Sequence, residues 1–154
     1  MKTFLKTFAI LFAISFLGSC SNDGIDDILP ENLEVTPNNI AGVWKLMEVN
    51  GAVLPADAYC YVEYIRKDKK FVMYQKFDSM YPRRITGRYS IENDAKRGSV
   101  LSGIYDFGMG EWNNKYIVSE LLESDMVLVS ESQDEVCKYM RCNEVPSDIL
   151  EQAK

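Results

Sequence analysis

The sequence predicts an all-β domain, an eight-stranded antiparallel up-and-down barrel. Two observations lead to this fold class. From Ile40 onward, apolar and polar residues alternate in short runs, and no segment keeps the 3.6-residue period of an amphipathic helix. Eight such runs fit before Pro146, with mostly tight turns between them. A β-sandwich is the alternative, but sandwiches usually need long crossover connections, for which this chain offers few places.

The first predicted strand covers residues 40–49 and ends at Asn50-Gly51, a strong signal for a two-residue hairpin turn. A loop through Pro55 leads to a second strand, rich in tyrosine, at residues 59–65. The charged cluster at residues 66–70 then turns the chain into a third strand at residues 71–77. Pro82 lies in the next loop, before a fourth strand at residues 85–91.

The second half of the chain continues the same pattern. A turn at residues 93–98 precedes a fifth strand at 100–107, and a loop rich in glycine and asparagine precedes a sixth at 116–121. The last two strands cover residues 126–130 and 136–142. Pro146 ends the final strand, and Ser147 is expected to cap a short helix that reaches about Ala153.

The first twenty residues have the composition of an export signal. Lys2 and Lys6 precede an apolar run at residues 8–17, which is too short to span a bilayer but fits the apolar region of a secretory signal. An ordinary signal peptide that happens to contain a cysteine is one interpretation. The segment Leu17-Gly18-Ser19-Cys20, however, resembles the lipobox of bacterial lipoproteins. This resemblance implies that residues 1–19 are removed and that Cys20 is triacylated, which would anchor the protein to a membrane.

Residues 20–39 are expected to form a flexible acidic tether between this anchor and the barrel. The acids directly after Cys20 are similar to the signal that sends some gram-negative lipoproteins to the outer face of the outer membrane, although a plain solvated linker explains them equally well. The protein is therefore predicted to be an outer-membrane lipoprotein of the cell envelope, facing either the periplasm or the cell surface. The tether contains no basic residue, two prolines, and the acids Asp23, Asp26, Asp27, Glu31 and Glu34.

Gly42-Val43-Trp44 resembles the Gly-x-Trp motif that opens lipocalins and the small lipocalin-like domains of bacterial lipoproteins. The resemblance implies a lipocalin-like barrel over residues 40–145, followed by a tail or short helix at 146–154. It also implies that Trp44 closes one end of the barrel and that Arg141, from the last strand, packs across it as a cation–π contact. An eight-stranded barrel is either packed solid or holds one small ligand.

Alternation along the strands gives a first estimate of a ligand pocket. Phe71, Met73, Tyr89 and Ile91 are expected to point inward, and a slip of one residue would reverse every face. The chain has nine tyrosines. They indicate either ordinary sheet packing or a pocket with polar aromatic walls, suited to an amphipathic or sugar-like ligand.

Once Cys20 is acylated, Cys60, Cys137 and Cys142 remain, and an exported protein is expected to form one disulfide and keep one free thiol. Cys137 and Cys142 would lie about 16 Å apart along an extended strand. A disulfide needs Cα atoms within about 7 Å, so a bridge between these two requires the strand to end or bend. Cys60 with either one is the alternative.

Composition argues against several classes of function. The chain has no histidine, which removes Ser–His–Asp and Cys–His nucleophiles and histidine-ligated zinc. No cysteine set has metal-ligand spacing, no glycine-rich loop suits a phosphate, and no cofactor is expected. A net charge of −6 disfavours nucleic acid. The protein is therefore predicted not to be an enzyme.

The leading hypothesis is a membrane-anchored, lipocalin-like lipoprotein that binds a small amphipathic or hydrophobic molecule. The alternative is a structural or interaction lipoprotein with a fully packed barrel, whose loops contact a protein or glycan partner. A large exposed apolar patch around Gly108 to Trp112, with Trp112 unburied, would favour this alternative.

Overall fold

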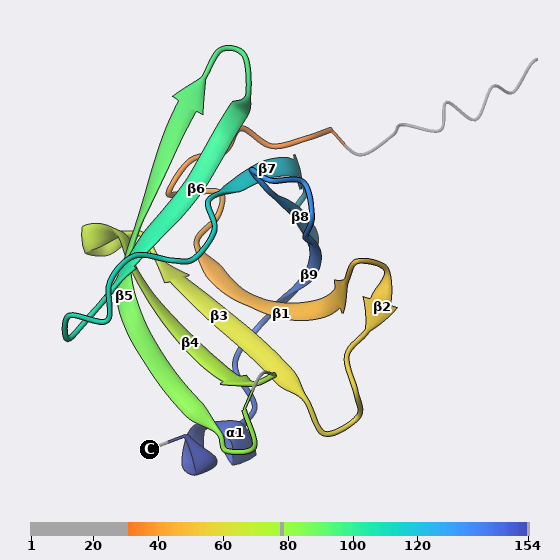
Figure 1. Ribbon diagram of the computed structural model, residues 1–154, viewed down its shortest axis with the longest axis vertical. Helices are drawn as coiled ribbons and strands as arrows, with labels where there is room; N and C mark the ends of the chain where they lie inside the picture. The colour runs from red at the N-terminus through yellow and green to blue at the C-terminus, as the bar shows by residue number, and fades with distance from the viewer. Residues whose placement is uncertain (1–30, 78, 154) are drawn as a thin grey trace, which may run out of the picture.

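The computed structural model describes residues 31–77 and 79–153, which form one antiparallel sheet closed into a barrel (Figure 1). The strands follow the order β2-β1-β3-β4-β5-β6-β7-β8-β9, and β1 also pairs with β9. Eight strands therefore form the closed barrel, which confirms the predicted fold class and excludes the sandwich. The strands are β1 (Gly42–Val49), β2 (Ala52–Val53), β3 (Tyr59–Ile65), β4 (Lys70–Lys76), β5 (Arg83–Asp94), β6 (Gly98–Tyr105), β7 (Tyr116–Leu121), β8 (Asp125–Ser130) and β9 (Val136–Cys142).

The turn predicted at Asn50-Gly51 is present. Both residues have positive φ, 51° and 77°, as a tight hairpin turn between twisted strands requires. The turn leads into β2, a two-residue strand that pairs with the end of β1 and that the sequence pattern did not predict. The Asn50 side chain also bonds to the β8–β9 turn: its Oδ1 accepts a hydrogen bond from the Val136 N–H.

The N-terminal segment joins the barrel earlier than expected. Leu33 and Val35 pack against the core, and the Leu33 N–H donates to the Leu121 carbonyl at 2.7 Å. The flexible tether predicted for residues 20–39 is therefore wrong from Leu33 onward. The segment is acidic overall, but its two apolar residues at alternate positions, Leu33 and Val35, pack against the barrel together with Ile40. Residues 20–30 lie outside the described part of the chain.

The C-terminal helix is α1 (Ser147–Gln152), and it lies on the outside of the barrel. Ile149 and Val145 pack there against Val43 and Tyr61 in a second, smaller apolar cluster. The prediction that Ser147 caps the helix is wrong, because Pro146 takes the cap position and no side chain bonds to the helix start. A helix this short is marginal alone, so its packing against the barrel holds it in place.

The barrel interior is filled over most of its length. Alternate residues of the strands point inward, as the period of two requires. Fully buried interior side chains include Trp44, Val62, Phe71, Leu101, Leu121, Met126 and Ser130. One stretch of the wall is different, because β6 and β7 pair only at Val100–Ile117 and Leu101–Tyr116.

A loop side chain completes this part of the wall. Past the short β6–β7 pairing, residues 106–115 fold back on β6, and the Trp112 N–H donates to the Gly103 carbonyl at 2.9 Å. The Trp112 indole lies so close to Gly103 that a Cβ added to this glycine would be 2.3 Å from the indole Cε2. Gly103 is therefore required by the close approach of the ring. At this point the barrel is closed by an indole and not by a paired strand.

Candidate functional site

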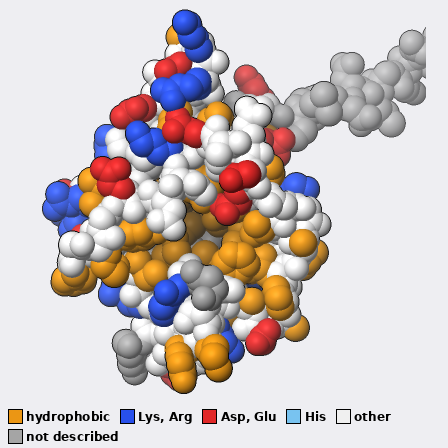
Figure 2. Space-filling model, viewed as in Figure 1, with side chains coloured by type: hydrophobic (Ala, Val, Ile, Leu, Met, Phe, Trp, Pro, Cys, Tyr) orange, Lys and Arg blue, Asp and Glu red, His pale blue; other side chains and the backbone are white. Residues whose placement is uncertain are grey.

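A cavity of about 200 Å³ lies inside the barrel, beneath the loop that carries Trp112. We call it the open-end cavity, because it is reached from the end of the barrel at which β9 begins. Figure 2 shows a hollow with hydrophobic side chains in it at the centre of this face, within the ring of strands seen in Figure 1. Its lining consists of Val62, Tyr64, Met73, Tyr105, Trp112, Asn113, Asn114, Tyr116, Leu128, Glu135 and Tyr139.

Aromatic rings make up much of this lining. Trp112 lies 6.4 Å from Tyr116 and 5.2 Å from Phe71 between ring centroids, in edge-to-face geometry. Tyr64 and Tyr139 come from the opposite wall, on β3 and β9. Burial raises the pKa of Tyr64 and of Tyr139 far above the ordinary value, so both keep their protons in the native protein. The cavity therefore presents neutral aromatic faces and hydroxyl groups.

Glu135 is the one charged residue in this lining. It lies just before β9, and its Oε1 accepts a hydrogen bond from the Tyr116 hydroxyl at 2.6 Å. The Cys137 thiol also points to Oε1, at 3.5 Å. No lysine or arginine in the described ranges, 31–77 and 79–153, forms an ion pair with this carboxylate. Burial and the nearby charge of Glu135 raise the pKa of Cys137 to about 12.

The turn between β8 and β9 fixes the position of Glu135. The Ser130 side chain is fully buried and accepts a hydrogen bond from the Glu135 N–H at 3.0 Å. The Ser130 and Ser132 hydroxyls both donate to Asp134, and these bonds lower the pKa of its carboxyl group. The carboxylate of Glu135 therefore stands on a rigid, hydrogen-bonded turn.

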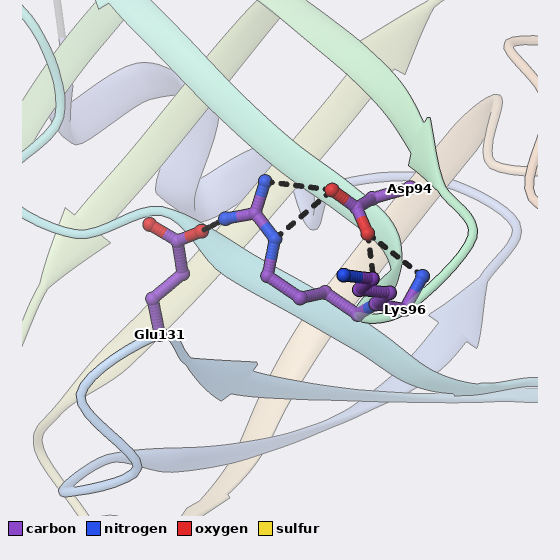
Figure 3. A network of polar contacts seen from close by, with 4 residues as sticks. Asp94, Lys96 and Glu131 are labelled. Atoms are coloured by element: carbon purple, nitrogen blue, oxygen red, sulfur yellow. Dashed lines mark hydrogen bonds and ion pairs between the residues drawn. The ribbon is translucent and has the colours of Figure 1, made fainter.

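A polar network ties a second hairpin to this turn (Figure 3). Asp94 accepts hydrogen bonds from the backbone N–H groups of Lys96 and Arg97 at the β5–β6 tip, and the Arg97 guanidinium bonds back to it. These bonds lower the pKa of the Asp94 carboxyl group. Arg97 also pairs with Glu131 on the β8–β9 turn. The long hairpin is thus fastened beside the open-end cavity.

The opposite end of the barrel is closed. The Arg141 guanidinium carbon lies 4.1 Å from the centroid of the Trp44 ring, so the structure brings these two predicted residues together. Arg141 donates to three carbonyls, those of Asn39, Ala41 and Glu123. Gly42 has a φ of 116°, and a Cβ there would lie 2.9 Å from Arg141 Nη1. Gly42 therefore leaves room for the guanidinium.

Of the four residues proposed from alternation, only Met73 lines the open-end cavity. Phe71 and Tyr89 are buried in the core, and Ile91 packs against the same core. All four therefore lie on the interior side of the sheet, but at different depths. Alternation gives the face of a residue, whereas depth depends on how the strands are staggered around the barrel. Within the described part of the chain, the buried Tyr89 hydroxyl has no hydrogen-bond partner.

The expected disulfide is absent from the described residues. Cys60, Cys137 and Cys142 form no disulfide with one another. Cys137 points into the core and Cys142 packs with the outer cluster under α1, so β9 continues through both and holds them on opposite sides. Cys60 shares the interior cluster with Cys137 but lies on β3, and β1 runs between β3 and β9. Cys20, the predicted lipidation site, lies outside the described residues.

The residues that give the cavity its chemistry could not be recognised from the sequence pattern. Glu135 resembled any other acid beside a turn, and no spacing distinguished it. Trp112 had one usable signal, since a tryptophan between glycines and asparagines is unusual in a solvated loop. In residues 31–77 and 79–153, no group of three or more Cys, Asp and Glu side chains is placed to hold a metal ion.

Within the same described residues, no helix has the length and apolar character needed to cross a membrane. The chain was also compared with protein-family models, with curated proteins and with solved structures, and none of the three comparisons gives a match.

Proposed function

We propose that this protein is a non-catalytic, lipocalin-like lipoprotein of the cell envelope that binds a small amphipathic molecule in the open-end cavity. The observation that carries the proposal is a cavity at one end of a barrel whose other end is closed by Trp44 and Arg141. An apolar cavity of about 150 Å³ is enough to hold a benzene-sized ring. A volume of about 200 Å³ therefore suits one ring or branched group with a few substituents.

The lining favours a ligand that has both apolar and polar parts. Val62, Met73 and Leu128 supply apolar surface, while Asn113 and Asn114 supply amide groups. The buried Nε1–H of Trp112 has no acceptor among the described residues. This atom lies closed off against Gly103, so the polar contacts offered to a ligand are those of the asparagine amides and the tyrosine hydroxyls.

A cavity-filling pair of variants tests this proposal. Met73→Phe adds a ring to the wall of the open-end cavity, whereas Met140→Phe makes the same change at a residue exposed on the outside of β9. The full-length protein is expressed in its own host, and co-purifying small molecules are measured by native mass spectrometry. We expect the parent protein and Met140→Phe to carry a ligand that Met73→Phe has lost. A parent protein that carries no ligand, or equal loading of both variants, would contradict the proposal.

The membrane anchor is a separate part of the proposal and has its own test. It is supported by the order of the charged, apolar and small residues that precede Cys20. We expect a labelled fatty acid to enter the parent protein and the protein to fractionate with membranes, and Cys20→Ser to abolish the label. Labelling that persists in Cys20→Ser would contradict an anchor at this position.

A second function, protein or glycan binding through the loops, has one observation in its favour. Phe107 is 94% exposed and Met109 is 57% exposed, both in the loop between β6 and β7. Trp112, in contrast, packs on Gly103 and belongs to the barrel wall. Phe107→Ser with Met109→Ser would weaken such a partner contact and leave the cavity ligand in place.

A further inference from the structure

We propose that the ligand of the open-end cavity is a small organic cation, a protonated amine or a quaternary ammonium group. This inference rests on the proposed function, because it specifies the ligand class of the same cavity. It comes from two features that the proposed function does not use: the charge of Glu135, and the arrangement of aromatic rings around it.

The open-end cavity has one charged group in its lining. Glu135 places a carboxylate in the lining of an otherwise uncharged cavity, and its Oε1 is already engaged by Tyr116. In the described part of the chain, the hydrogen bonds to this carboxylate fall on Oε1 and it forms no ion pair, and Glu135 is only partly exposed. Taking a carboxylate out of water is unfavourable unless a cation or a set of donors compensates it. A bound cation would supply the missing partner.

The walls of the cavity are rich in aromatic rings. Tyr64, Tyr105, Trp112, Tyr116 and Tyr139 contribute five aromatic rings to one small cavity. The face of an aromatic ring is electrostatically negative, so rings attract cations, and sets of rings are the usual receptors for quaternary ammonium groups. Aromatic walls and a carboxylate therefore favour the same kind of ligand.

The protein's own cationic side chains are directed away from this cavity. The lining of the cavity includes neither lysine nor arginine. Arg88 and Lys115 line a separate groove on the other side of Trp112, against β5 and β6. Lys138 pairs with Glu48, and Arg97 pairs with Asp94 and Glu131. Each of these side chains is therefore directed elsewhere, and the open-end cavity keeps a negative potential that would repel a carboxylate or phosphate ligand.

Choline and its neutral carbon isostere, 3,3-dimethylbutan-1-ol, test the inference because they share one shape and differ in charge. Binding to the full-length protein is measured by calorimetric titration. We expect the protein to bind choline about tenfold more tightly than the isostere, because the ring faces attract a partly desolvated cation but not a neutral group. Added salt should weaken choline binding and leave the isostere unchanged.

Glu135→Gln removes the charge but keeps an acceptor for the Tyr116 hydroxyl, so it is the informative variant. It should reduce the preference for choline to what the rings alone supply, without changing the affinity for the isostere. Glu135→Asp keeps the charge and should retain part of the preference. Glu120→Gln is the matched control, because it removes one exposed charge on the outside of β7 and should change neither affinity.

The outcomes separate this inference from the proposed function. If both probes bind equally and neither Glu135→Gln nor salt distinguishes them, the cation inference is wrong and the cavity remains a binding site. If neither probe binds but another molecule is lost in Met73→Phe, the cation inference is again wrong and the proposed function stands. If no molecule binds and Met73→Phe has no effect, both are overturned.

Discussion

The two ends of the barrel differ in how completely their polar groups are paired. At the closed end, Arg141 makes three hydrogen bonds to backbone carbonyls and stacks on Trp44, whose own Nε1–H donates to the Ile40 carbonyl at 2.8 Å. At the open end, within the described chain, Glu135 has no cationic partner and the Trp112 Nε1–H has no acceptor. Each end has a tryptophan, but among the described residues only the indole N–H of Trp44 has a hydrogen-bond acceptor.

This difference separates a structural role from a functional one. Charged and polar groups that are fully bonded stabilise a fold, whereas groups left without partners in a cavity lower stability until something binds to them. The closed end therefore behaves as part of the core. The open end retains a carboxylate in a cavity without a cationic partner, and it is formed by a loop and an incomplete strand pairing.

The largest expected effect is at the closed end. Trp44→Ala removes a fully buried indole and the ring on which Arg141 stacks, so we expect it to lower the free energy of unfolding by about 3–5 kcal/mol in urea denaturation. Trp112→Ala is the matched change at the open end, where the ring is only partly buried, and its cost should be clearly smaller. Equal losses would show that the two ends do not differ in this way.

An intermediate effect is expected at the wall of the cavity. Gly103→Ala places a Cβ 2.3 Å from the Trp112 ring and must displace it, at about 1–3 kcal/mol in the free energy of unfolding. The fluorescence of Trp112 should change while Trp44 stays buried. Ser102→Ala, at the neighbouring position, is the control and should leave the fluorescence unchanged. An unperturbed spectrum for Gly103→Ala would mean that the indole does not lie against β6.

Alkaline pH should weaken the native state through the buried tyrosines of the cavity and the Cys137 thiol beside it. In the unfolded chain a cysteine ionises near pH 9.0 and a tyrosine near pH 10.0, whereas burial raises the pKa of Tyr64, Tyr116 and Tyr139 and raises that of Cys137 to about 12. Above about pH 9 the unfolded state therefore binds fewer protons than the native state, and the free energy of unfolding falls as pH rises.

Urea denaturation at a series of pH values measures this dependence. Stability should be nearly constant at neutral pH and fall steadily as the pH rises above about 9. Tyrosinate absorbance from the buried rings should appear together with unfolding. Early ionisation of these rings in a native protein would show that the cavity is far more open to water.

The smallest effect is expected from the surface network beside the cavity. Arg97→Gln removes the pairs with Asp94 and Glu131, and exposed ion pairs contribute little because water and salt screen them. A double-mutant cycle with Glu131→Gln should give a small coupling that disappears at high salt. A large, salt-independent coupling would mean that this hairpin is held mainly by the ion pair.

The sequence could predict the strands because alternation records which residues face inward. It also predicted the Asn50-Gly51 turn, because two consecutive positive φ values favour these residue types. It failed for Leu33 and Val35, whose local composition is acidic and whose burial depends on the finished barrel. It failed for Ser147, which lies inside the helix that it was expected to cap.

The binding site was harder to predict than the fold. Met73 was identified as inward-facing, but Glu135 and Trp112 reach the cavity only through a turn and a long loop. Their positions depend on the short β6–β7 pairing and on the stagger of the strands, which no local pattern encodes. The chemistry of the cavity therefore emerges from the closed barrel and not from a motif.

The chain contains two tryptophans, one at each end of the barrel, and this permits a direct test of the account. The protein is labelled with 5-fluorotryptophan and titrated with the small-molecule extract of its host, and fluorine NMR follows the two resonances separately. We expect the Trp112 resonance to shift and saturate while the Trp44 resonance stays in place. A Trp112 resonance that never moves, or a shift confined to Trp44, would contradict this expectation.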